Sequence, residues 1–565
     1  MSAIDWLVLS ITLLSIIGYG IWKSRGTKSM QAYLLADRKL PWYHVGFSVM
    51  ATQASAITFL SAPGQGYTDG LRFVQFYFGL PLAMVILCIT FIPIFHKLNV
   101  YTAYEYLEKR FDGKTRLLTA FLFLLQRGLS TGITIYAPAI ILSTILGIDI
   151  LYTIIANGVL VISYTVYGGT KAVSHTHLLQ MSIVFAGLFL AAWLVVHLLP
   201  EHVSFTDALH IAGKLNKLNA LDTGFDLNNR YTLWSGLIGG FFLQLSYFGT
   251  DQSQVGRYLT GNSVNQSRLG LIMNGLIKIP MQFFILLIGV LVFTFYQFHQ
   301  EPVFFNKVET EKLDNSVYKT EYQNLQIDFQ NANAYKLRCV NELVEAVHSQ
   351  DESLVEASRE KVQDADTKSR AVKKQVQALI EKNNSLADTN DSNYIFLRFV
   401  TEHMPVGIVG LLIAIIFLAA MGSTASGLNS LASTTVIDFY KRLFKKEDSD
   451  ANYLSATRWA TYAWGVFCII TAIYASKLGN LIEAVNILGS LFYGTILGIF
   501  IVAFYFKKVG GNAVFIAALI AEVFVVCSWL MELTAFLWLN VIGCLFVVIF
   551  SILLEKLLKQ KPLRH

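Results

Sequence analysis

Long apolar runs alternate with short polar segments along almost the whole chain. A run of about 20 apolar residues crosses the hydrocarbon core of a membrane as a helix. Thirteen such spans are predicted, near residues 4–22, 42–66, 72–96, 116–146, 150–167, 175–198, 230–248, 268–299, 403–437, 456–476, 482–506, 511–532 and 535–557. The pattern therefore predicts an all-α membrane protein that crosses the bilayer many times.

One long polar segment, residues 300–392, interrupts this pattern. It carries 12 Lys+Arg and 17 Asp+Glu and is rich in Glu, Lys, Gln, Ala and Leu. Apolar residues recur at helical spacing on both sides of the polar run 349–353. This spacing predicts two helices of roughly 30–40 residues paired antiparallel. The hairpin is either a solvated insertion with no part in the main activity or a docking site for a protein partner.

Composition and charge agree with a membrane protein. Only 15% of the 565 residues are charged and 54% are hydrophobic, whereas a soluble domain carries about 25% charged residues. Lys and Arg collect in alternate loops, 24 on one side against 4 in the short loops of the other. Because basic loops stay in the cytoplasm, the N-terminus and the 300–392 hairpin are predicted outside and the C-terminus inside. The net charge of +6 then reflects orientation, so it does not indicate nucleic-acid binding.

Two spans are dense in small and polar residues, which predicts interrupted helices. Span 42–66 and span 230–248 would each begin one five-helix half of the protein, and they cross in opposite directions. Paired interrupted helices at matching positions of an inverted repeat are typical of the binding site of a secondary transporter. The alternative is that the small residues only allow close helix packing.

A third polar stretch, 419–430, lies in the ninth span and contains four hydroxyl side chains and one amide. Hydroxyls facing the carbonyls of an unwound helix would form a neutral oxygen cage suited to sodium. The alternative is that they bond back to their own helix.

Several motifs resemble those of the sodium:solute symporter family. They are the stretches 164–173, 247–257 and 426–430, the last leading to Asp438–Lys441, while 131–142 resembles the branch of iodide, monocarboxylate and multivitamin carriers. The resemblance covers nearly the whole chain except 300–392. It implies a LeuT-type core of ten helices in two inverted repeats, and sodium-driven uptake by alternating access. The expected division is 1–299, with a first repeat at 42–198 and a second from 230, then the insertion 300–392, then 393–565.

The resemblance also implies positions for the coupling ion, Na⁺, at Ala51, Ala54, Ala419 and Ser423. Three positions depart from the family pattern. Gly422 replaces a hydroxyl residue, His177 replaces a carboxylate, and Ala425 replaces the serine of members with a second sodium site. One sodium is therefore expected rather than two, with Thr424 or a water completing its coordination.

Substrate positions implied by the resemblance are Gln53, Thr58, Tyr77, Gln244, Tyr247, Lys278 and Asn486. Thr58 and Tyr77 stand where sugar carriers have an amide and a carboxylate, which argues against a plain hexose. Gln244 and Asn486 could still bind a sugar or polyol.

Arg127 is a separate candidate. It lies about 16 Å inside the cytoplasmic end of its span at 1.5 Å per residue, where a charge is costly and usually functional. It would attract an anionic solute or replace sodium electrostatically. The alternatives are pairing with a buried carboxylate or snorkelling to the surface.

These features predict a multi-pass transporter of the plasma membrane, in bacteria the inner membrane, that is not an enzyme. It would carry a small polar or anionic organic solute together with sodium. A solute-sensing receptor, a membrane enzyme, and a sugar or polyol symporter with altered cation coupling are the alternatives. The five cysteines show no spacing for a metal site or disulfide.

Overall fold

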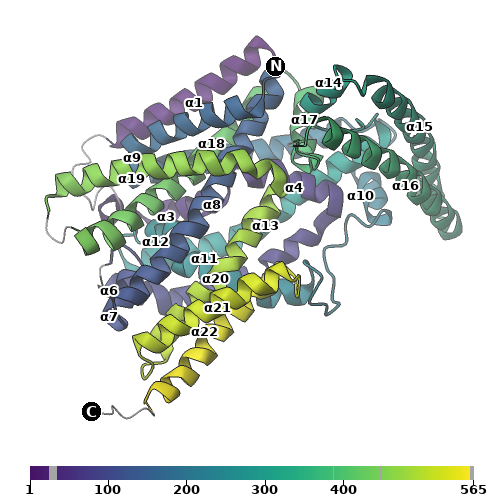
Figure 1. Ribbon diagram of the computed structural model, residues 1–565. Helices are drawn as coiled ribbons and strands as arrows, with labels where there is room; N and C mark the ends of the chain where they lie inside the picture. Colours follow the sequence, from purple (N-terminus) through teal and green to yellow (C-terminus); the bar gives the residue numbers. More distant parts are fainter. Residues whose placement is uncertain (25–34, 99, 386, 445–447, 560–565) are drawn as a thin grey trace.

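The computed structural model describes residues 1–565 except 25–34, 99, 386, 445–447 and 560–565, and it places most of the chain in one bundle of long helices (Figure 1). Part of the predicted loop 23–41 falls outside the described residues. Within the described residues, nine helices are long and apolar enough to cross a membrane, and Ile150–Ser163 is a shorter apolar helix. The prediction of an all-α membrane protein is confirmed.

The first half of the bundle runs from the N-terminus to position 197. Its helices are α1 Ala3–Ser24, α3 Trp42–Gln53, α4 Ala56–Asp69, η2 Gly70–Tyr77, α5 Leu80–Ile86, η3 Leu87–Phe91, α6 Ile92–Leu98, α7 Glu105–Arg110, α8 Gly113–Leu146 and α9 Ile150–His197. The predicted spans 150–167 and 175–198 both lie in α9. Positions 168–174, predicted as a loop, lie within the bounds of α9, and no proline interrupts this stretch. The side chains at 164 and 167–172 are outside the described set.

The second half begins after a surface loop that contains α10 Phe205–Lys214. Its helices are η4 Ser235–Gly240, α11 Phe241–Thr250, α12 Gln252–Tyr258, α13 Val264–Phe298, α17 Ile395–His403, α18 Ile408–Thr434, η6 Thr435–Phe444, α19 Asp450–Tyr474, α20 Leu481–Tyr505, α21 Gly511–Leu530 and α22 Phe536–Lys559. The predicted span 403–437 was wrong at its start, because α17 ends at His403 and Gly407, at φ +87°, precedes α18.

Both spans expected to be interrupted are interrupted. The helix of the first breaks at Ala54–Ser55, between α3 and α4. The second breaks at Asp251, which has extended backbone between α11 and α12, so the prediction that this span ends at 248 was too short. The helix continues because the Asp251 carboxylate caps α12 by accepting from the Ser253 amide at 2.8 Å.

Small residues also pack α4 tightly, as the alternative interpretation of this span expected. A Cβ on Gly66 would stand 2.3 Å from the Leu286 carbonyl oxygen, and one on Gly289 would stand 2.0 Å from that of Pro63. Helices α4 and α13 therefore touch backbone to backbone. Close packing and interruption occur in the same span, because they use different parts of it.

The insertion folds as a helical hairpin. Helices α15, Lys319–Ser349, and α16, Glu352–Asn383, are antiparallel, and the shorter α14, Lys307–Asp314, precedes them. Gln350 adopts φ +57° in the turn, and Asp351 caps α16 through the amides of Ser353 and Leu354. The two long helices match the spacing of the sequence, whereas α14 was not expected.

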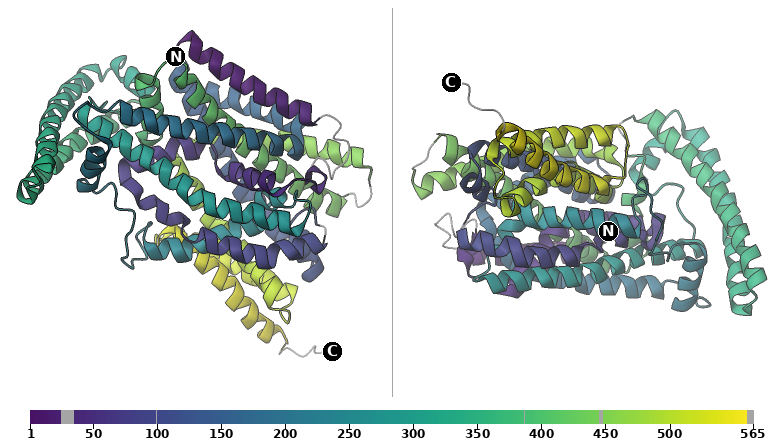
Figure 2. Two further views of the ribbon diagram at one scale, coloured as in Figure 1. Left: turned by 180° about the vertical axis from the view of Figure 1, so that it is seen from behind. Right: turned by 90° about the horizontal axis from the view of Figure 1, so that it is seen from below.

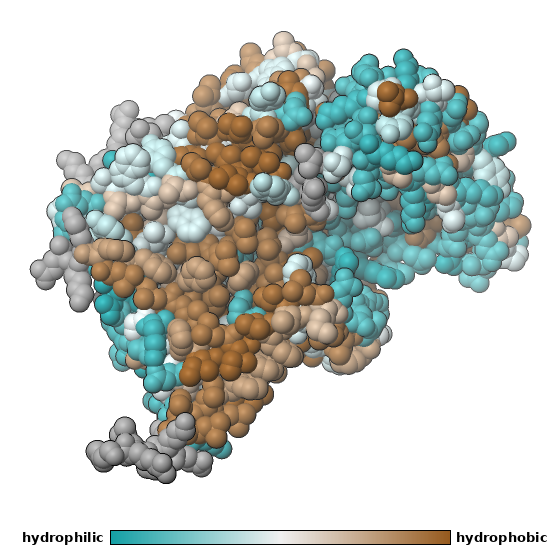
Figure 3. Space-filling view, in the orientation of Figure 1, coloured by the Kyte–Doolittle hydropathy of each residue, from teal (hydrophilic) through white to brown (hydrophobic). Residues whose placement is uncertain are grey.

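The hairpin and the N-terminus lie toward one end of the bundle and the end of α22 toward the other (Figure 2). The face of the bundle in Figure 3 is largely apolar, while the hairpin is largely polar. Large apolar side chains such as Leu14 on α1 and Val523 on α21 are exposed on the bundle. An apolar belt of this kind needs lipid around it, which agrees with a bundle that spans the bilayer and a hairpin outside it.

Candidate functional site

A cavity of about 90 Å³ lies beside the two helix breaks. Five segments line it: the α3–α4 break, η2, α8, α11 and α20. Seven of the eight substrate positions expected from the sequence line this one cavity, namely Gln53, Thr58, Tyr77, Arg127, Gln244, Tyr247 and Asn486. Positions that are hundreds of residues apart in the chain therefore meet at one place, between the interrupted helices.

Arg127 forms a buried ion pair at the wall of the cavity. Its guanidinium on α8 contacts the carboxylate of Asp251, whose side chain is fully buried, and only 11% of the Arg127 side chain is exposed. The Tyr493 hydroxyl donates to Asp251 at 2.8 Å and accepts from Arg127 at 3.2 Å. The Arg127 guanidinium also lies 5.5 Å from the centre of the Tyr247 ring. Pairing with a buried carboxylate, one of the alternatives for Arg127, is thus observed, although Arg127 also lines the cavity.

Several polar atoms around the cavity have no hydrogen-bond partner among the described residues. Both side-chain amide atoms of Gln244 and the Oε1 of Gln53 are in this state although they are buried. An unpaired buried polar atom costs free energy, and it gains a partner when a polar molecule or water enters. The cavity is therefore suited to a ligand that offers several hydrogen bonds.

Lys278 does not line the cavity. Its fully buried ammonium lies behind Tyr77, 5.5 Å from the centre of that ring, and has no hydrogen-bond partner among the described residues. The structure therefore places Lys278 one layer away from the cavity, where it acts on a ligand only through Tyr77.

The positions expected to hold sodium surround the first break. The carbonyl oxygens of Ala51 and Ala54 accept no hydrogen bond within the described part of the chain, because the helix ends at Gln53. The Ser423 hydroxyl donates to the Ala419 carbonyl at 3.0 Å, so it bonds to its own helix but keeps its oxygen lone pairs for a cation. This donor set fits sodium.

Gly422 and His177 face each other next to these positions. A Cβ on Gly422 would stand 2.9 Å from Nε2 of His177 and 2.8 Å from Oε1 of Gln180. The imidazole therefore occupies the space that a side chain at position 422 would need. Its Nδ1 lies 3.1 Å from the Ser48 hydroxyl on α3.

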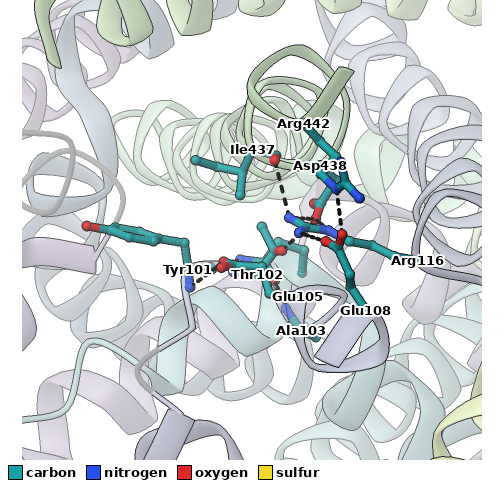
Figure 4. Close-up of polar contacts among 10 residues, drawn as sticks. Tyr101, Thr102, Ala103, Glu105, Glu108, Arg116, Ile437, Asp438 and Arg442 are labelled. Atoms are coloured by element: carbon teal, nitrogen blue, oxygen red, sulfur yellow. Dashed lines mark hydrogen bonds and ion pairs between the residues drawn. The ribbon is translucent and has the colours of Figure 1, made fainter. Parts of the chain in front are cut away.

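A second ion network joins α7, α8 and η6 (Figure 4), and α7 lies at the end of the bundle away from the hairpin (Figure 1). Arg116 on α8 contacts Asp438 of η6 at 2.6 Å and Glu108 of α7 at 2.7 Å, and Arg442 contacts Glu108 at 2.5 Å. Burial opposes ionisation of Glu108, but the hydrogen bonds from Arg116 and Arg442 outweigh it and lower its pKa. The network fastens α7 and α8 to η6.

Sequence reasoning missed Asp251 and Tyr493. Asp251 lies inside the motif 247–257 and just beyond the predicted span, so it was not considered as the partner of Arg127. Charge complementarity was the available signal, since a cation at membrane depth requires a nearby anion. Tyr493 carried no signal, because a tyrosine in an apolar span is ordinary.

Comparison with known proteins adds the family. The family model for the sodium:solute symporter family matches residues 33–318 and 376–521. The human sodium/iodide cotransporter is 33% identical over 299 residues, 52% of this chain and 45% of that protein. The sodium/sialic acid symporter of Aliivibrio fischeri is 26% identical over 570 residues, 99% of this chain and 94% of that protein. The match to the iodide cotransporter thus spans less than half of that relative.

Among solved structures, a Na⁺-coupled sialic acid symporter in a substrate-bound, outward-open state has the same fold. It superposes with a TM-score of 0.74 at 23% sequence identity and covers 98% of both chains. The LeuT-type fold expected from the sequence is confirmed by this match. The gap in the family match, 319–375, falls on the long helices of the hairpin. With most of its length matched by the family model, the chain belongs to the sodium:solute symporter family.

Proposed function

We propose that this protein carries a small anionic or polar organic solute across the membrane together with sodium, by alternating access. The observation that carries the proposal is the cavity at the two helix breaks, which combines Arg127 with amide and hydroxyl groups. Relatives that match most of the chain are sodium-coupled symporters of sialic acid and glucose. A transport cycle needs no covalent chemistry, so no enzymatic activity is proposed.

Arg127 gives the cavity its preference for an anion. The Asp251 carboxylate holds the guanidinium at the wall, and Tyr493 bridges the two groups. A solute carboxylate would accept from the guanidinium while Asp251 keeps its contact, because the Nε of Arg127 has no hydrogen-bond partner among the described residues. Gln244 and Asn486 would bind the other polar atoms of the solute. Because charge-assisted hydrogen bonds are about twice as strong as neutral ones, a carboxylate gains more here than a neutral sugar does.

Sodium would bind at the carbonyls of Ala51, Ala54 and Ala419 and the hydroxyl of Ser423. The first break joins this set to the cavity, because Gln53 and Ser55 on the same segment line it. Solute and sodium would thus stabilise the same arrangement of α3 and α4. The coupling is reciprocal, so each must raise the affinity of the other by the same factor.

The proposed location is the plasma membrane, with the N-terminus and the 300–392 hairpin outside and the C-terminus in the cytoplasm. The division into 1–299, 300–392 and 393–565 follows this arrangement. The apolar belt of the bundle and the polar surface of the hairpin support it. A sugar or polyol symporter is the second candidate, favoured by the unpaired amide of Gln244.

The test is a thermal-shift screen of the purified protein followed by uptake into proteoliposomes. Carboxylates, sugars and inorganic anions are compared in sodium and in potassium. A carboxylate that stabilises the protein only with sodium, and that then accumulates against its gradient, is the expected result. A ligand that binds equally in both salts and is not taken up would refute sodium-coupled transport and favour a receptor.

A further inference from the structure

A second, separate cavity of about 420 Å³ lies where the base of the hairpin meets the membrane helices. Its apolar wall comes from Ile150, Leu151 and Ile154 of α9, Val308 of α14 and Ile473 of α19. The helices α8, α9 and α19 contribute to it, together with α14 and the segment that follows α16. None of the residues of the transport cavity lines it.

One end of this cavity is acidic. Asp388 is 6% exposed and its Oδ2 has no hydrogen-bond partner among the described residues. Glu309 is 7% exposed, and its Oε2 is likewise without a partner in that part of the chain, while its Oε1 accepts from Lys312 at 2.8 Å. Both carboxyl groups line the cavity. When ionised, these two buried carboxyl groups carry the same negative charge, and a single lysine lies beside them. This end of the cavity therefore lacks the positive charge that would balance them.

Aromatic rings stand beside these acids. Tyr136 and Tyr394, both buried, line the same cavity. Tyr474 of α19 lines the cavity as well. The faces of aromatic rings attract cations, and rings combined with carboxylates are the usual means of binding an ammonium group.

We propose that this cavity binds an organic cation, an ammonium group carrying a short apolar body. The ammonium would sit between Asp388, Glu309 and the rings of Tyr136 and Tyr394, with the apolar body against Ile150, Ile154 and Ile473. The transport cavity has the opposite preference because it presents Arg127, so the two sites take different ligands. The site exists only because the insertion closes it, since α14 and the segment after α16 form one of its walls.

Protonation of Asp388 should make ligand binding in this cavity depend on pH, which an apolar cavity would not show. Burial, with the charges of Asp391 and Glu309 nearby, raises the pKa of Asp388 well above its usual range. The other charged groups lining the cavity are Glu309 and Lys312 on α14 and Asp149 before α9, while α8 and α19 contribute only neutral side chains to it. An ammonium pairs with the ionised carboxylate, so its affinity must rise as the pH rises through this range.

The experiment measures hexylammonium binding to the full chain by calorimetry, with hexanol and hexanoate as matched probes. Tighter binding of hexylammonium than of hexanol, and an affinity that increases from pH 5.5 to 8, are expected. Asp388→Asn should weaken hexylammonium binding about tenfold or more, the value of a hydrogen bond to a charged group, without changing hexanol binding. Glu311→Gln, which changes an exposed acid on α14 near Glu309, is the control.

Equal affinity for hexylammonium and hexanol, or an affinity independent of pH in the native protein, would overturn the proposal without depending on any variant. Nanodiscs distinguish the two sources of the ammonium. Competition by phosphatidylethanolamine, but not phosphatidylglycerol, assigns the site to a lipid headgroup, and its absence assigns it to a soluble amine. Solute uptake through the transport cavity is measured in parallel, since failure of one site leaves the other testable.

Discussion

Arg127 and Asp251 should behave as one unit, so that removing either charge harms the protein more than removing both. Arg127→Gln leaves the Asp251 carboxylate buried, with the Tyr493 hydroxyl and the Ser253 amide as its remaining donors. Asp251→Asn leaves the guanidinium of Arg127 against the Tyr247 ring without an anion. Each single variant therefore leaves one buried charge without a partner of opposite sign.

The magnitude follows from burial. The Asp251 side chain is 0% exposed and that of Arg127 is 11% exposed, so solvent screens the pair weakly. Breaking such a pair by removing one partner costs about 3–5 kcal/mol, whereas removing both costs much less. Each single variant should lose about 3 kcal/mol or more of stability, while the double variant loses less than either alone, which corresponds to a coupling energy of about 3 kcal/mol.

The assay is thermal unfolding of the four proteins in detergent, combined with solute affinity in the same preparations. Arg127→Lys is the matched control, because it keeps the charge but loses the second contact to Tyr493. If the two single losses add in the double variant, the ion pair does not act as a unit. If Arg127→Gln keeps the affinity for an anionic solute and its sodium dependence, the role of Arg127 in binding is refuted.

Three further outcomes follow from other contacts and groups in the structure. Burial lowers the pKa of Lys217 to about 8, so the folded state binds its proton less tightly than the unfolded state does. The stability of the protein should therefore rise between pH 8 and 10, by up to about 3 kcal/mol. Lys217→Met should flatten this rise, and an unchanged slope in the variant would contradict the assignment. Gly64→Ala places a Cβ 2.0 Å from the Ser392 carbonyl oxygen and should lower stability by about 2 kcal/mol or more. The control Gly18→Ala, whose Cβ meets open space, should not lower it. Equal melting temperatures of the two variants would refute the contact. Gly422→Ser should lower the melting temperature through its clash with His177, and the double variant with His177→Ala should recover it. A double variant that melts as low as Gly422→Ser would show that the two side chains do not compete for space.

The sequence predicted helices well and their ends poorly. Apolar runs of membrane length give spans directly, because the bilayer requires them. Ends depend on local interactions that hydropathy does not record. Asp251 extends its helix to Tyr258 by capping α12, and Gly407 separates α17 from α18 by adopting a positive φ. The hairpin was predictable for the same reason as the spans, since its apolar spacing persists on both sides of the turn at Gln350.

The cavity shows where sequence reasoning reaches its limit. Most of the expected substrate positions meet because the fold of the family places them, and a resemblance transfers that placement. Lys278 matched the same pattern, yet Tyr77 stands between it and the cavity. A residue can thus match the family pattern without lining the cavity, because a neighbouring side chain, here that of Tyr77, determines whether it reaches the cavity.

The same dependence on side-chain size governs the altered positions at the sodium site. Gly422 and His177 look in the sequence like two separate losses, a hydroxyl and a carboxylate. In the structure they are one exchange of volume, because the imidazole fills the space that a side chain at 422 would occupy. A serine at 422 would meet the imidazole of His177 and the Oε1 of Gln180. The carbonyls of Ala51 and Ala54 do not take part in this exchange, since the helix break alone frees them. At the proposed sodium site the carbonyl ligands therefore remain available, whereas Gly422 and His177 have removed a hydroxyl and a carboxylate, so we expect weakened rather than abolished sodium binding.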